Sequence, residues 1–262
     1  MQWPKVELLY PEIVLELLYP EIVLSGMMSR MKAGRRAYIA EFIGTFALVF
    51  FGSLSVTIFA SNVLGLGSPA ASIIGIAFTH GLILMVMVYA IGWISGCHIN
   101  PAITITAVAL KRLDFDDGVG YLLAQIVGAV LAGLVHLLIQ PGNGALTHYG
   151  AVAPSPAIRG SNLTALVIEA IITFFLMFSV YAVLYTGKVS QGASGVLIGM
   201  TYAADILIAG ALTGGAANPA RALGPAVASG DYTSLWVYWV GPIIGALIAG
   251  FVYEHLLMPK KR

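Results

Sequence analysis

Two long stretches without formal charge constrain this chain most strongly. Residues 42–110 and 118–158 contain no Asp, Glu, Lys or Arg and are largely apolar. A helix needs roughly 20 apolar residues to cross a hydrocarbon layer about 30 Å thick, and each stretch is long enough to cross at least once. The pattern therefore predicts membrane-spanning helices and excludes a soluble enzyme.

The composition agrees with this interpretation. Charged residues make up 10% of the chain and hydrophobic residues 59%, with a mean hydropathy of +0.91. A formal net charge of +1 provides no basic surface for nucleic acid. Cys97 is the only cysteine, which excludes a disulfide within the chain.

The N-terminal segment differs from the rest of the sequence. The segment ELLYPEIVL at 7–15 recurs unchanged at 16–24, and each copy carries a proline and two glutamates. Such a segment makes a poor span, and it lacks the basic start and cleavage site of a secretory signal. We expect residues 1–26 to be a dispensable extension and residues 27–262 to form a single membrane domain. The alternative is an amphipathic segment on the membrane surface.

The apolar sequence divides at charges, Gly/Pro clusters and polar loops into six segments of spanning length. These spans are expected at about 37–60, 71–93, 119–139, 163–185, 192–212 and 234–256. Two further apolar stretches, 100–110 and 218–229, are about half as long, and both begin with Asn-Pro-Ala. The sequence therefore predicts an all-α membrane protein with six spans and two short helices.

Basic residues orient this arrangement. With six spans, most lysines and arginines fall on one side of the membrane, and only Arg159 and Arg221 fall on the other. The residues on the first side are Arg30, Lys32, Arg35, Arg36, Lys111, Arg112, Lys188, Lys260, Lys261 and Arg262. An excess of Lys and Arg marks the cytoplasmic side, so both termini are expected in the cytoplasm.

The chain also repeats itself. The segment IAEFIGTFALVF at 39–50 matches VIEAIITFFLMF at 167–178, with Glu41 aligned to Glu169. Each half, about 37–139 and 163–256, then holds an odd number of full crossings, so the second half enters from the opposite face. The result is an inverted repeat, in which the two short helices re-enter the membrane from opposite sides.

The paired motifs explain where the short helices begin. Asn is a favoured N-cap and Pro a favoured first helical residue. A single Asn-Pro-Ala would indicate only a helix start in a loop, but two at matching places of a repeat indicate two half-helices. Irregular backbone at membrane depth persists only where it is buried in protein or lines a wet cavity. The motif residues are Asn100, Pro101, Ala102, Asn218, Pro219 and Ala220.

With these motifs the chain resembles the major intrinsic protein family, the aquaporins and glycerol facilitators. The resemblance rests on AEFIGTF at 40–46, SGCHINPA at 95–102, the second Asn-Pro-Ala-Arg at 218–221 and WVGPIIGA at 239–246. The phrase GCHINPA is most similar to archaeal members, and residues 224–242 are similar to plant vacuolar members. The resemblance implies a right-handed bundle in the lipid bilayer, one pore per subunit, a homotetramer and no cofactor.

Elementary electrostatics gives this fold a mechanism. Two half-helix N-termini at the midplane each present about half a positive charge, and the amides of Asn100 and Asn218 add donors there. A water that accepts from both amides turns its own hydrogens outward and interrupts a proton wire, and the dipoles raise the energy of a cation. We therefore expect a passive, osmotically driven water channel that excludes protons and ions.

The resemblance also implies which residues line the pore. Pore carbonyls are expected at Gly96, Cys97, His98, Gly214, Gly215 and Ala216. Spacing from the two motifs places the outer constriction at His80, Ile206, Gly215 and Arg221. The familiar water-selective pattern has an aromatic residue first and histidine second. The set found here is similar to that of vacuolar members credited with ammonia passage.

The resemblance separates water channels from glycerol facilitators at further positions. Glycerol facilitators usually carry Asp after the second motif, Lys four residues later and Pro-Leu in the last span. This chain has Ala222, Ala226 and Tyr238-Trp239 at these places. Water is therefore the expected cargo, with ammonia in addition and a glycerol facilitator as the alternative. The plasma membrane is expected, with the vacuolar membrane as the other location.

Several intramembrane residues allow more than one role. Glu41 and Glu169 are expected to accept hydrogen bonds from the re-entrant loops rather than form a catalytic dyad. Asp205 is unexplained and keeps an ion-coupled transporter open as an alternative. Cys97 suits a pore thiol or a buried apolar position equally well. His148 and Tyr149 are expected in a solvated loop. The pairs Gly195/Gly199 and Gly241/Gly245 are expected at close helix crossings.

Overall fold

The computed structural model describes residues 34–61 and 68–258, and the extension predicted at 1–26 lies outside these residues. Over the described ranges the chain forms helices and no strand. In chain order they are α3 (Arg35–Ala60), α4 (Pro69–Ser95), α5 (Pro101–Ala109), α6 (Phe115–Ile139), α7 (Pro141–Leu146), η1 (His148–Gly150), η2 (Pro156–Ile158), α8 (Asn162–Tyr185), α9 (Gln191–Thr213), α10 (Pro219–Ser229), α11 (Val237–Val252) and η3 (Tyr253–Leu257).

Within the described ranges, six helical segments are long and apolar enough to cross a membrane: α3, α4, α6, α8, α9 and the joined segment Val237–Leu257. The predicted all-α architecture with six spans is confirmed. The two half-length stretches form α5 and α10, and each begins at the proline of an Asn-Pro-Ala motif.

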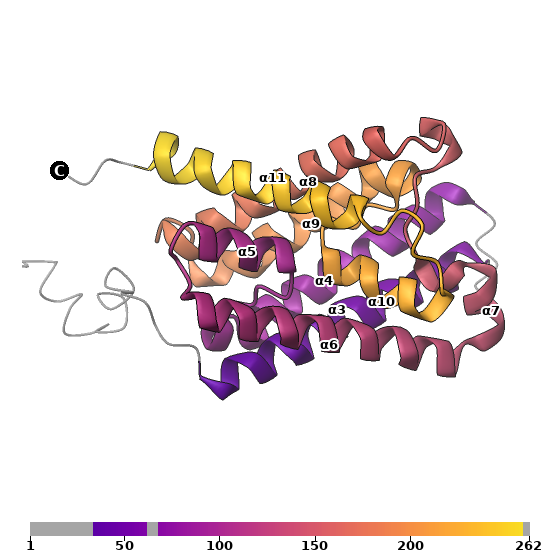
Figure 1. The fold of residues 1–262 in the computed structure, drawn as a ribbon, viewed down its shortest axis with the longest axis horizontal. Helices are drawn as coiled ribbons and strands as arrows, with labels where there is room; N and C mark the ends of the chain where they lie inside the picture. Colours follow the sequence, from indigo (N-terminus) through magenta and orange to yellow (C-terminus); the bar gives the residue numbers. More distant parts are fainter. Residues whose placement is uncertain (1–33, 62–67, 259–262) are drawn as a thin grey trace, which may run out of the picture. The chain divides into compact units, whose positions relative to one another are not determined.

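The long helices run alongside one another, and the two short helices lie among them (Figure 1). Helix α5 packs on α6 and α11, and α10 packs on α3 and α6. The short helices begin near the middle of the bundle and run toward opposite ends (Figure 1). This is the arrangement that an inverted repeat requires.

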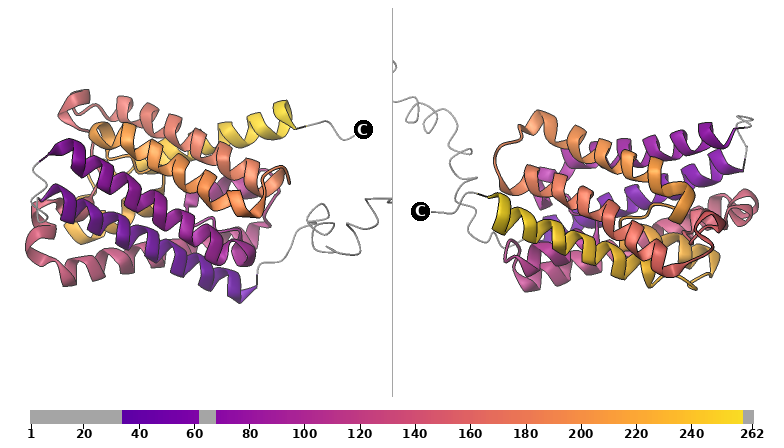
Figure 2. Two further views of the ribbon diagram at one scale, coloured as in Figure 1. Left: turned by 180° about the vertical axis from the view of Figure 1, so that it is seen from behind. Right: turned by 90° about the horizontal axis from the view of Figure 1, so that it is seen from above.

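The helix pairs reflect the repeat. Helix α3 packs on α6 as its counterpart α8 packs on α11, and the equivalent helices α4 and α9 pack on each other. Figure 2 shows α3, α4 and α9 side by side from behind. The two halves therefore join where α4 packs on α9, and also where α10 packs on α3 and α6 and where α5 packs on α11.

Glycine allows the closest of these approaches. A methyl group built on Gly81 of α4 would lie 2.5 Å from the Gly199 carbonyl oxygen, and one on Gly199 would lie 2.5 Å from the Gly81 oxygen. A methyl group on Gly241 of α11 would lie 2.8 Å from the Leu166 carbonyl oxygen of α8. Because these backbones touch, the predicted close crossings are present and exclude any larger side chain.

The outer surface of the spans is apolar, unlike the surface of a soluble protein. Large apolar side chains are exposed on the outside of the spans, for example Leu123 at 60% and Phe251 at 56%. Two charged side chains within spans, Glu41 of α3 and Glu169 of α8, are fully buried. Lipid can solvate the apolar surface, whereas the buried charges need partners within the protein.

Candidate functional site

The two half-helices begin with the same side-chain cap. The Oδ1 of Asn100 accepts the backbone N–H of Ala102 at 2.9 Å, and the Oδ1 of Asn218 accepts the N–H of Ala220 at 2.9 Å. Asn218 also accepts from Arg221 N at 3.3 Å. The amide oxygen of each asparagine is thus bound to its own helix, which turns the amide NH2 away from that helix.

The amide nitrogens cross between the halves. Asn100 Nδ2 donates to the Ala217 carbonyl at 2.8 Å, and Asn218 Nδ2 donates to the Ile99 carbonyl at 3.0 Å. Both asparagines are buried. Since each NH2 carries two hydrogens, one donor of each amide remains for another acceptor. The structure thus brings the N-termini of α5 and α10 together.

The loops before the half-helices share an unusual backbone. Positive φ angles occur at equivalent positions in both loops: 80° at Gly96 and 88° at Gly214, 52° at Cys97 and 60° at Gly215. Ile99 at 40° and Ala217 at 46° form the third pair. A side chain in this region costs about 1–3 kcal/mol, so surrounding contacts must hold each loop in place.

In the first loop, that contact comes from Glu41. Its Oε1 accepts Ser95 Oγ–H at 2.7 Å and the His98 N–H at 2.9 Å. Its Oε2 accepts the Ile99 N–H at 2.6 Å and Gln125 Nε2–H at 2.7 Å. One carboxylate therefore satisfies two buried backbone donors of the re-entrant loop.

Glu169 makes the equivalent contacts in the second loop. Its Oε1 accepts Thr213 Oγ1–H at 2.6 Å and the Ala216 N–H at 3.1 Å, and its Oε2 accepts the Ala217 N–H at 2.7 Å. The two carboxylates thus bind separate loops, one in each half. Each is occupied by backbone and hydroxyl donors rather than paired with the other.

Sequence reasoning missed a second layer of support. Tyr121 OH donates to the Ser95 carbonyl at 2.9 Å, and Tyr238 OH donates to the Thr213 carbonyl at 2.7 Å. These tyrosines lie on the equivalent helices α6 and α11. An ungapped extension of the internal alignment does not pair them, because Tyr121 lies one residue further from Asn100 than Tyr238 lies from Asn218. Gln125, which bridges Glu41 and Thr104, was missed as well.

The residues whose carbonyl groups are predicted to line the pore lie in these two loops. Cys97 and His98 are each 7% exposed, and the His98 ring contacts Thr104 Oγ1 through Nδ1 at 3.1 Å. The Ala216 carbonyl accepts Tyr202 OH at 2.8 Å, so one of its acceptor positions is occupied. Gly96 and Gly214 end α4 and α9 in the left-handed conformation.

Ile206 and Gly215, two of the residues predicted at the constriction, adjoin each other. A methyl group on Gly215 would lie 3.2 Å from Ile206 Cα, so no larger residue fits there unchanged. His80 is fully buried, with Nδ1 2.9 Å from the Ile76 carbonyl, and none of the described residues bonds to its Nε2. Gly52 of α3 leaves the space that the imidazole occupies.

Arg221 lies on the first turn of α10 and is 2% exposed. Its NH1 donates to the Gly150 carbonyl at 3.0 Å, and its Nε has no hydrogen-bond partner in the part of the chain that the structure describes. His80 and Arg221 lie at the same part of α3: a methyl group on Gly52 would overlap His80 Nε2, and one on Gly150, which bonds to Arg221, would lie 3.0 Å from the Ser53 carbonyl oxygen. The structure therefore places Arg221, His80, Ile206 and Gly215 in one region.

Other candidate residues lie outside this region or differ from expectation. Asp205 is 7% exposed, and its Oδ2 accepts no hydrogen bond from residues 34–61 or 68–258. His148 is exposed, but the prediction of a solvated loop is wrong for Tyr149, which is 6% exposed. Its ring lies edge-on against His136 at 5.4 Å, and its OH donates to the Pro141 carbonyl at 3.1 Å. The Tyr149 ring is therefore packed inside the protein, although the residue belongs to a connecting segment.

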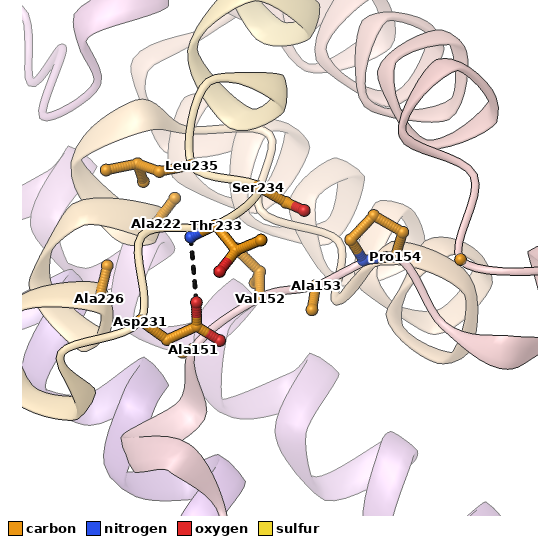
Figure 3. Close-up of a pocket in the computed structure, with 11 residues that line it drawn as sticks. Ala151, Val152, Ala153, Pro154, Ala222, Ala226, Asp231, Thr233, Ser234 and Leu235 are labelled. Atoms are coloured by element: carbon orange, nitrogen blue, oxygen red, sulfur yellow. Dashed lines mark hydrogen bonds between the residues drawn. The ribbon is translucent and has the colours of Figure 1, made fainter.

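A cavity of about 240 Å³ opens between the segment after η1 and the connection from α10 to α11. The cavity is lined by Ala151–Pro154 and by Ala222, Ala226 and Asp231, among others (Figure 3). Asp231 Oδ1 accepts the Thr233 N–H at 3.0 Å, and this bond holds the pKa of the exposed carboxyl below its usual range. The cavity thus presents a carboxylate at neutral pH.

Comparison with known proteins decides the family. The family model described as "Major intrinsic protein" matches residues 27–253. The chain belongs to the major intrinsic protein family. It is 40% identical over 224 residues to "Aquaporin NIP1-1" of Zea mays, and the matched region covers 85% of this chain and 75% of that protein. It is 38% identical over 230 residues to "Probable aquaporin TIP2-2" of Oryza sativa subsp. japonica, which covers 86% and 89%.

The fold supports the same assignment. The aquaglyceroporin from Plasmodium falciparum superposes with a TM-score of 0.73 at 24% identity, covering 86% of this chain and 97% of that chain. Members of the major intrinsic protein family are channels and not enzymes. This chain is therefore a multi-pass membrane channel of the class that carries water and small solutes.

Proposed function

We propose that the protein is a passive water channel. Water crosses in either direction under an osmotic gradient, while protons and ions are excluded. The observation that carries this proposal is the reciprocal bonding of Asn100 and Asn218, which holds the N-termini of two half-helices against each other. Each asparagine keeps a second amide hydrogen that a passing water can accept.

The charge distribution supports the exclusion of cations and protons. Each half-helix N-terminus carries about half a positive charge, and the Arg221 guanidinium adds a full charge. A water that accepts hydrogen bonds from Asn100 and Asn218 points its own hydrogens away from both. A proton wire requires hydrogen bonds of one sense along the file of waters, so such a water interrupts it.

Ammonia is the second cargo that we propose. Gly215 and Ile206 provide no polar side chain, so this part of the constriction suits a small neutral solute. His80 provides a buried ring nitrogen without a protein partner. A glycerol facilitator is the alternative, which Ala222 and Ala226 make less favourable because glycerol facilitators usually carry Asp and Lys at these places.

We further infer a homotetramer in the plasma membrane with both termini in the cytoplasm. The basic residues support this orientation. Arg112, between α5 and α6, bonds to Glu254 of η3 at 2.8 Å, so this connection and the end of the last span share one end of the bundle. Lysine and arginine concentrate at cytoplasmic ends. A reporter fused to the C-terminus would test the orientation.

Proteoliposomes test the proposed cargo. In stopped-flow light scattering, vesicles with the protein should shrink faster than empty vesicles under an osmotic step. Under an ammonium gradient, an internal pH dye should report faster alkalinisation. Glycerol influx well above that of empty vesicles would favour the facilitator, and saturable uptake that collapses with an ion gradient would favour a transporter. No gain in osmotic permeability rejects the water channel.

A further inference from the structure

A buried polar cluster surrounds His136 on α6, outside the residues that the proposed water path uses. His136 is fully buried within a span. Its Nδ1 lies 3.0 Å from Ser53 Oγ and its Nε2 lies 3.1 Å from Thr57 Oγ1, both on α3. Each ring nitrogen thus has a hydroxyl partner, as a buried imidazole requires.

The cluster continues from α3 into the outer loop. Thr57 Oγ1 lies 2.8 Å from Thr147 Oγ1, and Thr147 joins α7 to η1. The Tyr149 ring lies edge-on to the His136 ring at 5.4 Å. The loop formed by residues 141–150 is therefore attached to His136 by one hydroxyl relay and one ring contact.

The outer loop ends in three residues whose backbone conformation is unfavourable and must be held by surrounding contacts. His148, Tyr149 and Gly150 have φ angles of 48°, 53° and 75°, in the left-handed region that side chains rarely adopt. Gly150 also lies directly against α3, because a methyl group on it would be 3.0 Å from the Ser53 carbonyl oxygen. Ser53 is the same residue whose hydroxyl contacts His136.

The last residue of this loop holds the arginine of the constriction. The Gly150 carbonyl accepts Arg221 NH1–H at 3.0 Å, and this is the hydrogen bond that the structure gives the buried guanidinium. The position of Arg221 thus depends on the position of Gly150. Gly150 in turn depends on the contacts of the loop with α3 and α6.

We propose that His136 is a positioning residue for Arg221. It fixes Thr57 and Thr147, which hold residues 141–150 in the left-handed turn that presents the Gly150 carbonyl to the guanidinium. The inference rests on the proposed role of Arg221 in the constriction. His136 does not contact the solute. It acts through the outer loop on the position of Arg221, and therefore on the width of the constriction.

Three substitutions separate this role from packing. His136→Leu introduces an apolar side chain of similar size and removes both ring nitrogens. His136→Gln places an amide near the position of Nε2 and so keeps the arm toward Thr57 and Thr147. Thr147→Val keeps the shape of the loop residue and removes its hydroxyl. Thr186→Val is the matched control: within the described ranges its hydroxyl bonds to the local backbone alone, donating to the Ala182 carbonyl of α8 and accepting from the Lys188 N–H.

The first measurement observes the guanidinium directly. In nanodiscs with 15N-labelled arginine, the side-chain signals of Arg221, assigned by their loss in Arg221→Lys, should be resolved because the bond to Gly150 slows rotation. In His136→Leu and Thr147→Val these signals should merge or broaden, while His136→Gln and Thr186→Val should keep the wild-type spectrum. An unchanged Arg221 spectrum in His136→Leu would overturn the inference.

The second measurement observes the consequence for transport. The ratio of glycerol to water permeability in the same vesicles is independent of the amount of folded channel. A mobile Arg221 should raise this ratio about threefold in His136→Leu and Thr147→Val, a change of ~0.7 kcal/mol in relative barriers. His136→Gln should restore it. A wild-type ratio in both variants overturns the role in selectivity. Wild-type vesicles that conduct no water reject the proposed function, and the spectrum of Arg221 still decides the positioning role.

Discussion

Asn100 and Asn218 each donate a hydrogen bond to the loop that precedes the other, at 2.8 Å to Ala217 and 3.0 Å to Ile99. The two halves of the inverted repeat are therefore bound to each other through the residues that start their half-helices. A change in either asparagine acts on both loops at once.

Asn218→Asp tests the role of the Asn218 amide as a hydrogen-bond donor. The substitution keeps the oxygen that caps α10 but replaces the amide donor to Ile99 with an oxygen. Two acceptors would then face each other, which costs about 1–3 kcal/mol of unfolding free energy. We expect a lower Tm in detergent and a lower osmotic permeability per channel. Asn162→Asp is the matched control, because that residue accepts from Ser234 and lies partly exposed. Equal Tm values for the two variants would contradict the donor role.

Glu41→Gln and Glu169→Gln test the anchoring of the re-entrant loops. Each substitution turns an NH2 toward a backbone N–H and leaves buried donors unsatisfied, at a cost of about 1–3 kcal/mol. Thermal unfolding should show a similar loss for both variants. Glu254→Gln, in the partly exposed ion pair with Arg112, should cost only about 0–1 kcal/mol. Wild-type stability together with lost function would instead revive a chemical role for these carboxylates.

Tyr121→Phe and Tyr238→Phe test the repeat at the level of single bonds. Each variant removes one hydroxyl that donates to the carbonyl of the last residue of α4 or α9. The expected loss is about 0.5–1.5 kcal/mol in each case. Tyr232→Phe, on an exposed tyrosine, should leave Tm unchanged. A large loss in one half and none in the other would show that the halves are not supported alike.

Gly52→Ala tests how His80 is held. A methyl group at this position would overlap His80 Nε2, so the imidazole must move away from α3. We expect a fall of about twofold or more in water permeability, or ~0.4 kcal/mol in the barrier. Gly92→Ala is the control, since its added methyl group would meet only Val88 Cγ1 at 3.9 Å. Equal permeabilities in Gly52→Ala and wild type would remove His80 from the constriction.

Much of the fold could be predicted because its main signals are local. Charge-free stretches located the spans, and the two Asn-Pro-Ala motifs located the starts of α5 and α10 within a residue. The alignment of Glu41 with Glu169 predicted equivalent positions, because the same buried loop needs the same acceptor in each half.

Contacts between helices could not be predicted in this way. The bonds of His136 with Ser53 and Thr57 depend on which faces of α3 and α6 meet, and the sequence pattern does not say which polar residues of the two helices face each other. The burial of Tyr149 depends on Gly144, because a methyl group there would overlap its ring. A single glycine in a loop gives no sign of the ring that it accommodates.

The most direct test of the account measures water and proton flux in the same proteoliposomes. We expect stopped-flow light scattering to show osmotic permeability well above that of empty vesicles. Under a pH gradient with a potassium-clamped potential, proton entry should stay at the rate of empty vesicles. Proton entry that rises with the amount of channel, or osmotic permeability equal to that of empty vesicles, would contradict a water path interrupted at Asn100 and Asn218.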